Sequence, residues 1–460
     1  MGRTLLLVRK LLSLSLALIA ALPAIAATAA PAEGARLDPS FGTGGRLTLP
    51  RTLGELGSTV PLPDGRLLLD LREQLLCLLP SGQIDTGFGE AGYLSMQPPA
   101  GRTGGYGSFT VDQLGRLILV GSSSLPPSDG VAPTPLEDRP ADAFVQRFTP
   151  NGQLDPSFGG GDGTVLTDFG LEPAEPGLSP QVGASSAVID ERGRIVLTGY
   201  RAEGIRVSKQ GYKRRGSEAF LARLGGDGEV DRSFAGAGVL PLPGSDLVGA
   251  VVADRDGGSF AIAWDESRGT LVRLDADGRF DPTFGDNGGR TVPRISGRNS
   301  AAMGPLGLDP SGQLLLTAKL QGWREKARAN GIGIKRFLGD GSLDRDFARR
   351  GLLSFRFPRM VVAGVSADRE GGFLVAMSLR EKGNREQAAP PLELALARLG
   401  ADGELDPGFG RAGILPIPLR GKADIYLGSF APTADGKALL EVIRCAKGCR
   451  TILVRIDLRA

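Results

Sequence analysis

The sequence predicts an all-β protein, a seven-bladed β-propeller built from four-stranded antiparallel blades. Three observations support this fold class. A short phrase recurs seven times, each repeat contains segments typical of four strands, and the two ends of the chain supply complementary parts of one repeat. A repeat of this length describes one supersecondary unit stacked on copies of itself. The sequence therefore indicates an architecture and names no substrate.

The recurring phrase, here called the motif, reads Leu-Asp-Pro-Ser-Phe-Gly at 37–42. Its Asp and its Phe occur in every copy. The Asp residues are Asp38, Asp85, Asp155, Asp231, Asp281, Asp344 and Asp406. The Phe residues are Phe41, Phe88, Phe158, Phe234, Phe284, Phe347 and Phe409. The mean spacing is about 61 residues, slightly longer than the usual blade repeats.

Each repeat contains four strand-like segments. A short apolar run such as 46–50 follows the motif, and a hairpin turn with Asp64 and Gly65 comes next, where glycine supplies the positive φ of a tight turn. The run after the turn, for example Leu67–Leu69, is continuously apolar and typical of a strand buried on both faces. The last segment, for example Phe144–Phe148, includes Arg in alternation, so we expect an outer strand with one solvent-facing side.

The ends of the repeat array predict ring closure. The array begins with a motif at Leu37 and ends with the strand-like segment Thr451–Asp457, which no motif follows. We expect the motif to connect the outer strand of one blade to the inner strand of the next. Its Phe would fill the space between adjacent blades, where burial of one ring stabilises the fold by roughly 2–3 kcal/mol.

The motif, its spacing and the Asp-Gly turn before it resemble the bacterial delta-60 repeat, a family found in exported and surface proteins with propeller-like repeats. The resemblance covers residues 37–460. It implies the propeller architecture and supplies no catalytic residue.

The start of the chain has the composition of a signal peptide. Basic residues precede an apolar core at 11–22, and Ala24–Ala26 form a small-residue cleavage pattern. We predict a signal peptide at 1–26, a short segment at 27–36 and the propeller at 37–460. The apolar core is too short to span a membrane, so we expect a periplasmic or secreted protein with no transmembrane segment after cleavage.

Composition limits the chemistry. The sequence contains no histidine, which excludes Ser-His-Asp and Cys-His catalysis and His-bearing zinc sites. Lys and Arg number 54 and Asp and Glu 51, and the leader holds three of the bases, so the rest is neutral and nucleic-acid binding is not indicated. We predict no catalytic residue, cofactor or metal ligand. The alternative is a histidine-independent propeller enzyme, of the lyase or lactonase type, acting on a carbohydrate.

The pattern of acidic residues favours turns over metal sites or catalytic sites. Four repeats contain Asp-Gly-x-x-Asp, for example Asp227 to Asp231, which suggests calcium, but no bidentate Glu recurs and a plain turn is favoured. We expect the segments after the motif to line the central channel. Asp168 is almost their only acid, which argues against a pair of carboxylates for glycoside chemistry.

One face of the predicted disc is expected to be basic. The connections between the third and fourth segments lengthen at 121–142, 200–218, 319–331 and 380–391. The last three, with the hairpin at 444–450, contain 16 bases and 5 acids. The hypothesis is a monomeric, non-catalytic binding or scaffolding module for an anionic polysaccharide, lipid headgroup or envelope protein. The alternative is that these loops simply carry soluble charge. The candidate residues are Arg206, Lys209, Lys213, Arg214, Arg215, Trp323, Arg324 and Lys326.

The three cysteines fit an exported protein. Cys445 and Cys449 flank a three-residue hairpin loop, and an oxidising compartment favours a disulfide between them over a metal site. Cys77 lies in an apolar segment and is expected to be a buried free thiol.

Overall fold

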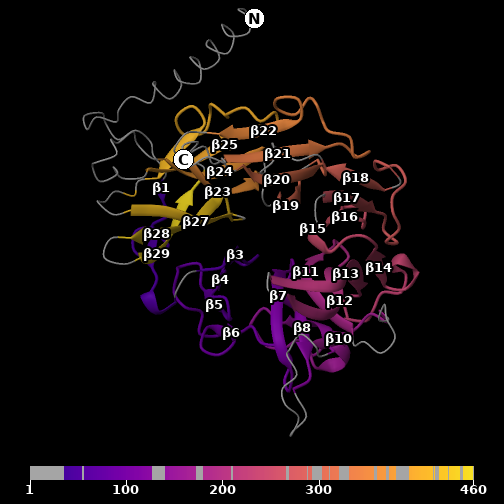
Figure 1. Ribbon diagram of the computed structural model, residues 1–460. Coiled ribbons are helices and arrows are strands. Elements are labelled where there is room, and N and C mark those ends of the chain that lie inside the picture. The colour runs from indigo at the N-terminus through magenta and orange to yellow at the C-terminus, as the bar shows by residue number, and fades with distance from the viewer. Residues whose placement is uncertain are drawn as a thin grey trace, which may run out of the picture.

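The computed structural model is a ring of seven antiparallel sheets around a central axis (Figure 1). It describes residues 36–53, 56–126, 140–171, 180–208, 211–265, 269–286, 288–292, 303–309, 311–320, 331–356, 360–368, 372–379, 393–417, 419, 424–433, 435–445 and 449–458. The described part is almost entirely β, and its helical elements are the short 3-10 turns η1 (Arg51–Leu53), η3 (Gly159–Gly161) and η4 (Phe234–Gly236).

The first four blades each contain four consecutive strands. Blade 1 consists of β3 (Thr59–Pro61), β4 (Leu67–Asp70), β5 (Gln74–Leu78) and β6 (Tyr93–Ser95). Blade 2 consists of β7 (Thr103–Val111), β8 (Leu117–Ser124), β9 (Asp142–Phe148) and β10 (Thr164–Thr167). Blade 3 consists of β11 (Pro180–Ile189), β12 (Ile195–Ser208), β13 (Gly211–Leu224) and β14 (Val239–Leu242). Blade 4 consists of β15 (Leu247–Ala253), β16 (Ser259–Trp264), β17 (Gly269–Leu274) and β18 (Gly289–Val292).

The last three blades complete the ring, and the seventh uses both ends of the described chain. Blade 5 consists of β19 (Met303–Leu308), β20 (Leu314–Leu320), β21 (Gly331–Phe337) and β22 (Leu352–Arg356). Blade 6 consists of β23 (Met360–Ala367), β24 (Phe373–Leu379), β25 (Glu393–Leu399) and β26 (Ile414–Ile417). Blade 7 combines β27 (Asp424–Pro432), β28 (Lys437–Cys445) and β29 (Cys449–Asp457) with β1 (Arg36–Leu37) and β2 (Arg46–Thr48).

The predicted fold class and the ring closure are confirmed, because β1 and β2 both pair with β29. The predicted position of the motif is wrong. In blade 2 the strand order is β7-β8-β9-β10, so the motif connects the third strand to the fourth, outermost strand of the same blade. The innermost strands β3, β7, β11, β15, β19, β23 and β27 surround the central opening (Figure 1).

This strand order moves the long connections to a different place within the blade. They join the second strand to the third, as β12 to β13 in blade 3, rather than the third to the fourth. Because successive connections in an antiparallel blade alternate between its two ends, these connections share one face of the disc, here called the loop face. The Gly turns and the motifs lie on the opposite face, here called the motif face.

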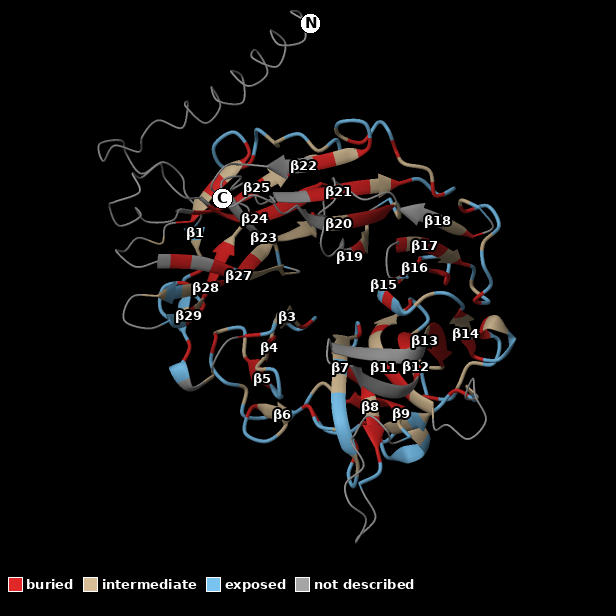
Figure 2. Ribbon diagram, in the orientation of Figure 1, coloured by how far each residue is buried: buried red, intermediate tan, exposed pale blue. Residues whose placement is uncertain are grey.

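Among the described residues the hydrophobic core forms seven clusters, and each cluster lies between two adjacent blades. Every cluster contains one motif Phe, as predicted, and these rings are at most 2% exposed. Phe409, for example, packs with Leu396 of blade 6 and Leu440 of blade 7. Figure 2 shows buried residues along the strands and exposed residues at many of the turns on the rim. The motif Phe therefore joins blades to one another.

Phe284→Ala and Phe280→Ala test this role within one copy of the motif. Phe284 is fully buried, whereas Phe280 is 41% exposed. We expect Phe284→Ala to lower the free energy of unfolding by about 3–5 kcal/mol, because it leaves a cavity between blades. Phe280→Ala should cost less than about 1 kcal/mol. Urea unfolding followed by circular dichroism measures both, and equal losses would contradict an inter-blade role for Phe284.

Candidate functional site

The Arg of the third strand is buried, which corrects the prediction of a solvent-facing side on that strand. In blade 2, Arg147 is 2% exposed, and its Nε donates a 2.7 Å hydrogen bond to Asp155 of the motif. Its guanidinium lies 4.5 Å from the ring centroid of Phe158, a cation–π contact. The same group also donates to the carbonyl oxygen of Gly226 in blade 3. One side chain therefore joins the motif turn, the motif ring and the next blade.

The same arrangement recurs around the ring. The Nε–carboxylate distance is 2.7 Å for Arg223–Asp231, 2.8 Å for Arg336–Asp344 and 2.7 Å for Arg455–Asp38. The guanidinium–ring distances are 4.9 Å for Arg223–Phe234, 4.6 Å for Arg336–Phe347, 4.5 Å for Arg398–Phe409 and 4.9 Å for Arg455–Phe41. In blades 2 to 6 each Arg precedes its motif Asp by eight residues. This constant spacing was the sequence signal that could have identified the pair.

Blade 1 departs from the pattern and compensates for it. Cys77 occupies the position of the third-strand Arg, eight residues before Asp85. Arg66, which follows the Gly turn, instead reaches Asp85 at 2.8 Å and donates to the carbonyl oxygen of Pro150 in blade 2 at 2.9 Å. The predicted buried free thiol is confirmed, and burial raises the pKa of Cys77 to about 12. The motif carboxylate thus keeps a guanidinium partner, which here comes from the residue just before β4.

A second buried Asp precedes the Gly turn in five blades. In blade 3, Asp190 accepts backbone N–H groups of its turn and lies 2.7 Å from Nε of Arg194. Blades 4 to 6 have no base at that position, and their third-strand Arg serves both carboxylates. Arg273, for example, lies 3.0 Å from Asp254 and 3.4 Å from Asp281. These carboxylates are engaged in turns and ion pairs that hold the blades.

The Asp-Gly-x-x-Asp segments form turns. Asp227 accepts a hydrogen bond from the backbone N–H of Glu229 at 3.1 Å. Asp231 accepts hydrogen bonds from the backbone N–H and the hydroxyl of Ser233 and from the guanidinium of Arg223. Across the described ranges, no group of three or more Cys, Asp or Glu side chains is arranged to hold a metal ion. The turn interpretation is therefore the one that these contacts support.

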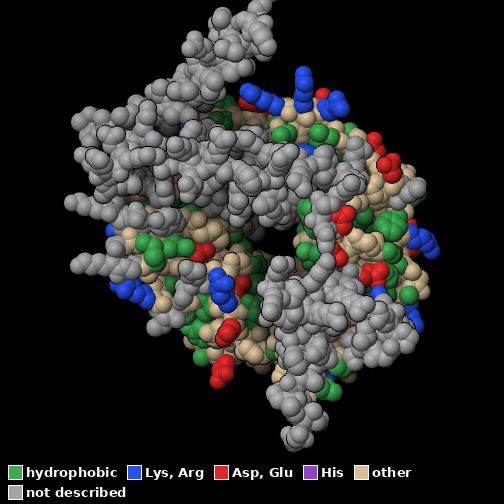
Figure 3. Space-filling model, in the orientation of Figure 1, with side chains coloured by type: hydrophobic (Ala, Val, Ile, Leu, Met, Phe, Trp, Pro, Cys, Tyr) green, Lys and Arg blue, Asp and Glu red, His purple; other side chains and the backbone are tan. Residues whose placement is uncertain are grey.

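The innermost strands around the central opening are rich in small and apolar residues, for example β15 and β23. Six of the innermost strands contain a β-bulge. The segments after the motif, which were expected to line the channel, instead form the outermost strands at the rim of the disc. Asp168 accordingly follows the outermost strand β10 and accepts the N–H of Gly170 at 2.8 Å in a turn. Figure 3 shows the opening at the middle of the disc.

Blades 2 and 3 approach each other closely at the bulge of β7. A Cβ atom at Gly107 of β7 would lie 2.6 Å from the carbonyl oxygen of Ala184 in β11, so only glycine permits this approach. Backbone hydrogen bonds also cross between the two blades, since Val182 N–H donates to Ala141 at 2.8 Å. These blades are therefore joined through their backbones as well as their side chains.

The loop face carries a two-stranded ribbon. Strands β12 and β13 each contain 14 residues and continue beyond β11 and β14. Their register places Arg206 opposite Lys213 and Ile205 opposite Arg214. At the base of the ribbon Arg201 pairs with Glu218 at 2.9 Å, so Arg201 is neutralised. Arg215 also lies on β13, whereas Lys209, Trp323, Arg324 and Lys326 lie outside the described residues.

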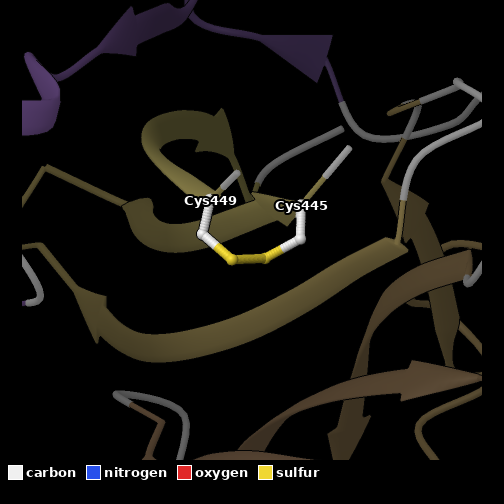
Figure 4. Close-up of a disulfide and its surroundings, with 2 residues drawn as sticks. All are labelled: Cys445 and Cys449. Atoms are coloured by element: carbon white, nitrogen blue, oxygen red, sulfur yellow. A yellow bond between two sulfur atoms is a disulfide. The ribbon is translucent and has the colours of Figure 1, made fainter. Parts of the chain in front are cut away.

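The predicted disulfide is present on the loop face (Figure 4). Cys445 and Cys449 are register partners at the ends of β28 and β29, with a Cα–Cα distance of 4.0 Å. The bond closes the hairpin of blade 7. Within the described residues, no helix is long and apolar enough to cross a membrane.

Comparison with protein families identifies three segments of the chain. A family model for a domain of unknown function with a β-propeller structure (DUF5122) matches residues 140–158, 257–284 and 383–409. Each matched segment ends at a motif Phe. No curated protein matches the sequence.

Several solved structures are similar to this chain at low sequence identity. The Dos1 propeller is 9% identical, with 85% of this chain and 75% of that chain covered and a TM-score of 0.39. Prolyl oligopeptidase B from Galerina marginata is 10% identical, with 88% of this chain and 49% of that chain covered and a TM-score of 0.44. Polysaccharide lyase Uly1 is 10% identical, with 76% of this chain and 90% of that chain covered and a TM-score of 0.36.

Asp155, Asp231 and Asp281 of the motif predict an acid-sensitive fold. Burial raises the pKa of Asp155, but hydrogen bonds from Ser157 and the charge of Arg147 outweigh it, so its pKa is lowered. The pKa of Asp231 and of Asp281 is also lowered, chiefly by hydrogen bonds from Ser233 and Thr283. Because the unfolded chain then binds more protons in acid, the free energy of unfolding falls as pH drops below about 4.

Urea midpoints measured between pH 7 and pH 3 test this expectation. We expect little contribution from these groups to any change between pH 7 and 5, and a progressive fall below about pH 4. Asp155→Asn should reduce the size of that fall, since one of the groups with a lowered pKa is removed. A midpoint that stays constant to pH 3 would contradict the assignment.

Proposed function

We propose that the protein is an exported, non-catalytic propeller that serves as a binding or scaffolding module in the bacterial cell envelope or outside the cell. It belongs, on this proposal, among the delta-60 repeat proteins. The motif and its spacing support that membership, as does the match of three segments to a family model with a propeller structure. The leader at 1–26 and the disulfide Cys445–Cys449 support export, because disulfides persist in oxidising compartments.

The observation that carries the proposal is the ribbon formed by β12 and β13 on the loop face. The backbone register brings Arg206 level with Lys213 and next to Arg214, and Arg215 follows on the same strand. The ribbon also contains two acids: Glu203 is the register partner of Arg215, and Glu218 at the base is paired with Arg201. Four bases against Glu203 give the ribbon a net positive charge, in a chain that has equal numbers of bases and acids once the leader is removed. An anionic polysaccharide, lipid headgroup or acidic protein is the partner that such a charge attracts.

The composition of the channel supports a role in binding rather than catalysis. Glycine, alanine, serine and apolar residues dominate the innermost strands, for example β15 and β23. The buried Arg and Asp residues of the motif face are engaged with one another and with backbone groups. Strands β15 and β23 therefore offer no charged side chain to the channel that could serve as a catalytic acid or base.

A binding experiment with a matched control tests the proposal. The mature protein is passed over immobilised polygalacturonate, an anionic polysaccharide, at low and high salt. We expect retention at low salt and release at high salt, because electrostatic contacts at a surface are screened. Changing Lys213, Arg214 and Arg215 together to Glu should weaken binding at least about tenfold.

The control variant changes Arg345, Arg349 and Arg350 to Glu. These residues are exposed in the motif loop of blade 5, on the opposite face, and the change in net charge is identical. Binding by this variant should stay within about twofold of the unchanged protein. Equal weakening in both variants would indicate attraction by net charge alone and contradict a site on the ribbon. Anionic vesicles and an acidic protein, run in parallel, distinguish the three partner classes.

A further inference from the structure

Blade 7 differs from the other six blades because its motif is not continuous with its third strand. In blades 1 to 6 a tight turn joins the third strand to the motif, so that Arg147 and Asp155 are eight residues apart. In blade 7 the motif at 37–42 meets β29 from the opposite end of the chain, and Arg455 and Asp38 are 417 residues apart. The contact between these segments is entirely non-covalent.

The edge of β29 holds the incoming segment through a short ladder. Leu37 pairs with Ile456, and β2 pairs with Val454, Leu453 and Ile452. Backbone hydrogen bonds at either end extend the ladder, for example Leu49 N–H to Thr451 at 2.9 Å. Phe41 then fills the cluster between blades 7 and 1. The segment 36–49 therefore binds as an added strand with one anchoring ring.

The edge of β29 and the neighbouring Lys437, here called the acceptor edge, also bind the motif through charge. Asp38 lies 2.7 Å from Arg455 and 2.9 Å from Lys437, and Ser40 donates to it through N–H and hydroxyl. Lys437 also contacts Asp435 at 3.1 Å. Burial raises the pKa of Asp38, but the bonds from Ser40 and Lys437 and the charge of Arg455 lower it well below its usual range. The acceptor is thus complementary to a segment with a motif Asp.

We propose that the edge of β29 is a strand-binding site for a second copy of this chain, occupied in the closed ring by residues 36–49 of the same chain. Every copy presents the same acceptor and the same segment, so two chains can exchange segments and close both rings reciprocally. Separation of the segment leaves β29 as an unpaired edge and exposes Phe41 and Leu49, and the segment of a second copy restores these contacts.

Two variants, each with one introduced cysteine in addition to the buried Cys77 and the disulfide Cys445–Cys449, test the exchange in the mature protein. Thr48 and Ile452 are register partners at a position without a backbone hydrogen bond, where side chains lie close enough for a disulfide. Thr48→Cys protein is mixed with Ile452→Cys protein under mild oxidation, and non-reducing electrophoresis detects a covalent heterodimer. We expect the heterodimer to form. The double variant should form an internal disulfide and remain a monomer in dilute solution.

Asp38→Asn in both partners should raise the rate of heterodimer formation at least about tenfold, because Arg455 and Lys437 lose their carboxylate. Asp155→Asn is the matched control, since blade 2 is covalently continuous, and it should change the rate by less than about twofold. If Asp38→Asn fails to fold, Lys437→Met supplies a milder variant, because it removes only one of the two bases that pair with Asp38.

Two results would overturn the proposal. One is the absence of heterodimer over a period in which the double variant becomes fully cross-linked, both in buffer and in sub-denaturing urea. The other is a heterodimer that forms equally well between Thr48→Cys and Glu229→Cys, an exposed position far from the acceptor edge. The proposal is supported by a heterodimer that forms only with Ile452→Cys and forms faster in the Asp38→Asn or Lys437→Met background.

Discussion

The ring depends on a buried guanidinium that contacts a carboxylate, a phenyl ring and a carbonyl of the neighbouring blade at once. Arg223 shows the full set, with Asp231 at 2.7 Å, the Phe234 ring at 4.9 Å and the carbonyl of Ala276 at 2.6 Å. A buried charge is expensive unless it is paired and hydrogen-bonded, so removal of any partner leaves the others unsatisfied. The blades are consequently held by a repeated set of mutually dependent contacts rather than by hydrophobic packing alone.

Variation among blades shows which part of this unit is required. Blade 1 lacks the third-strand Arg, and Arg66, which lies between the turn and β4, pairs with the motif Asp instead. Blade 6 lacks that second base and shares Arg398 between Asp368 and Asp406. In both cases the carboxylates keep a guanidinium partner, although its position on the backbone changes. The motif Asp therefore requires a guanidinium partner nearby, and the sheet can supply that partner from more than one position in the blade.

The sequence predicted those features that depend on hydrophobicity and spacing. The invariant Phe residues, the ring closure and the disulfide follow from residue type and position, and Cys77 follows from its apolar neighbours. The order of strands within a blade did not follow, because an apolar run does not specify which neighbour it pairs with. Burial of Arg147 was missed because alternation of apolar and charged residues describes an ion-paired strand as well as a solvent-facing one.

The glycine approach between blades 2 and 3 has a mechanical consequence. Gly107 and the backbone bond from Val182 to Ala141 make these two blades a stiffer pair than side-chain packing alone would. The ribbon of β12 and β13 extends from blade 3, which belongs to this pair. A load applied to the ribbon is therefore carried into both blades through backbone contacts as well as through side-chain packing.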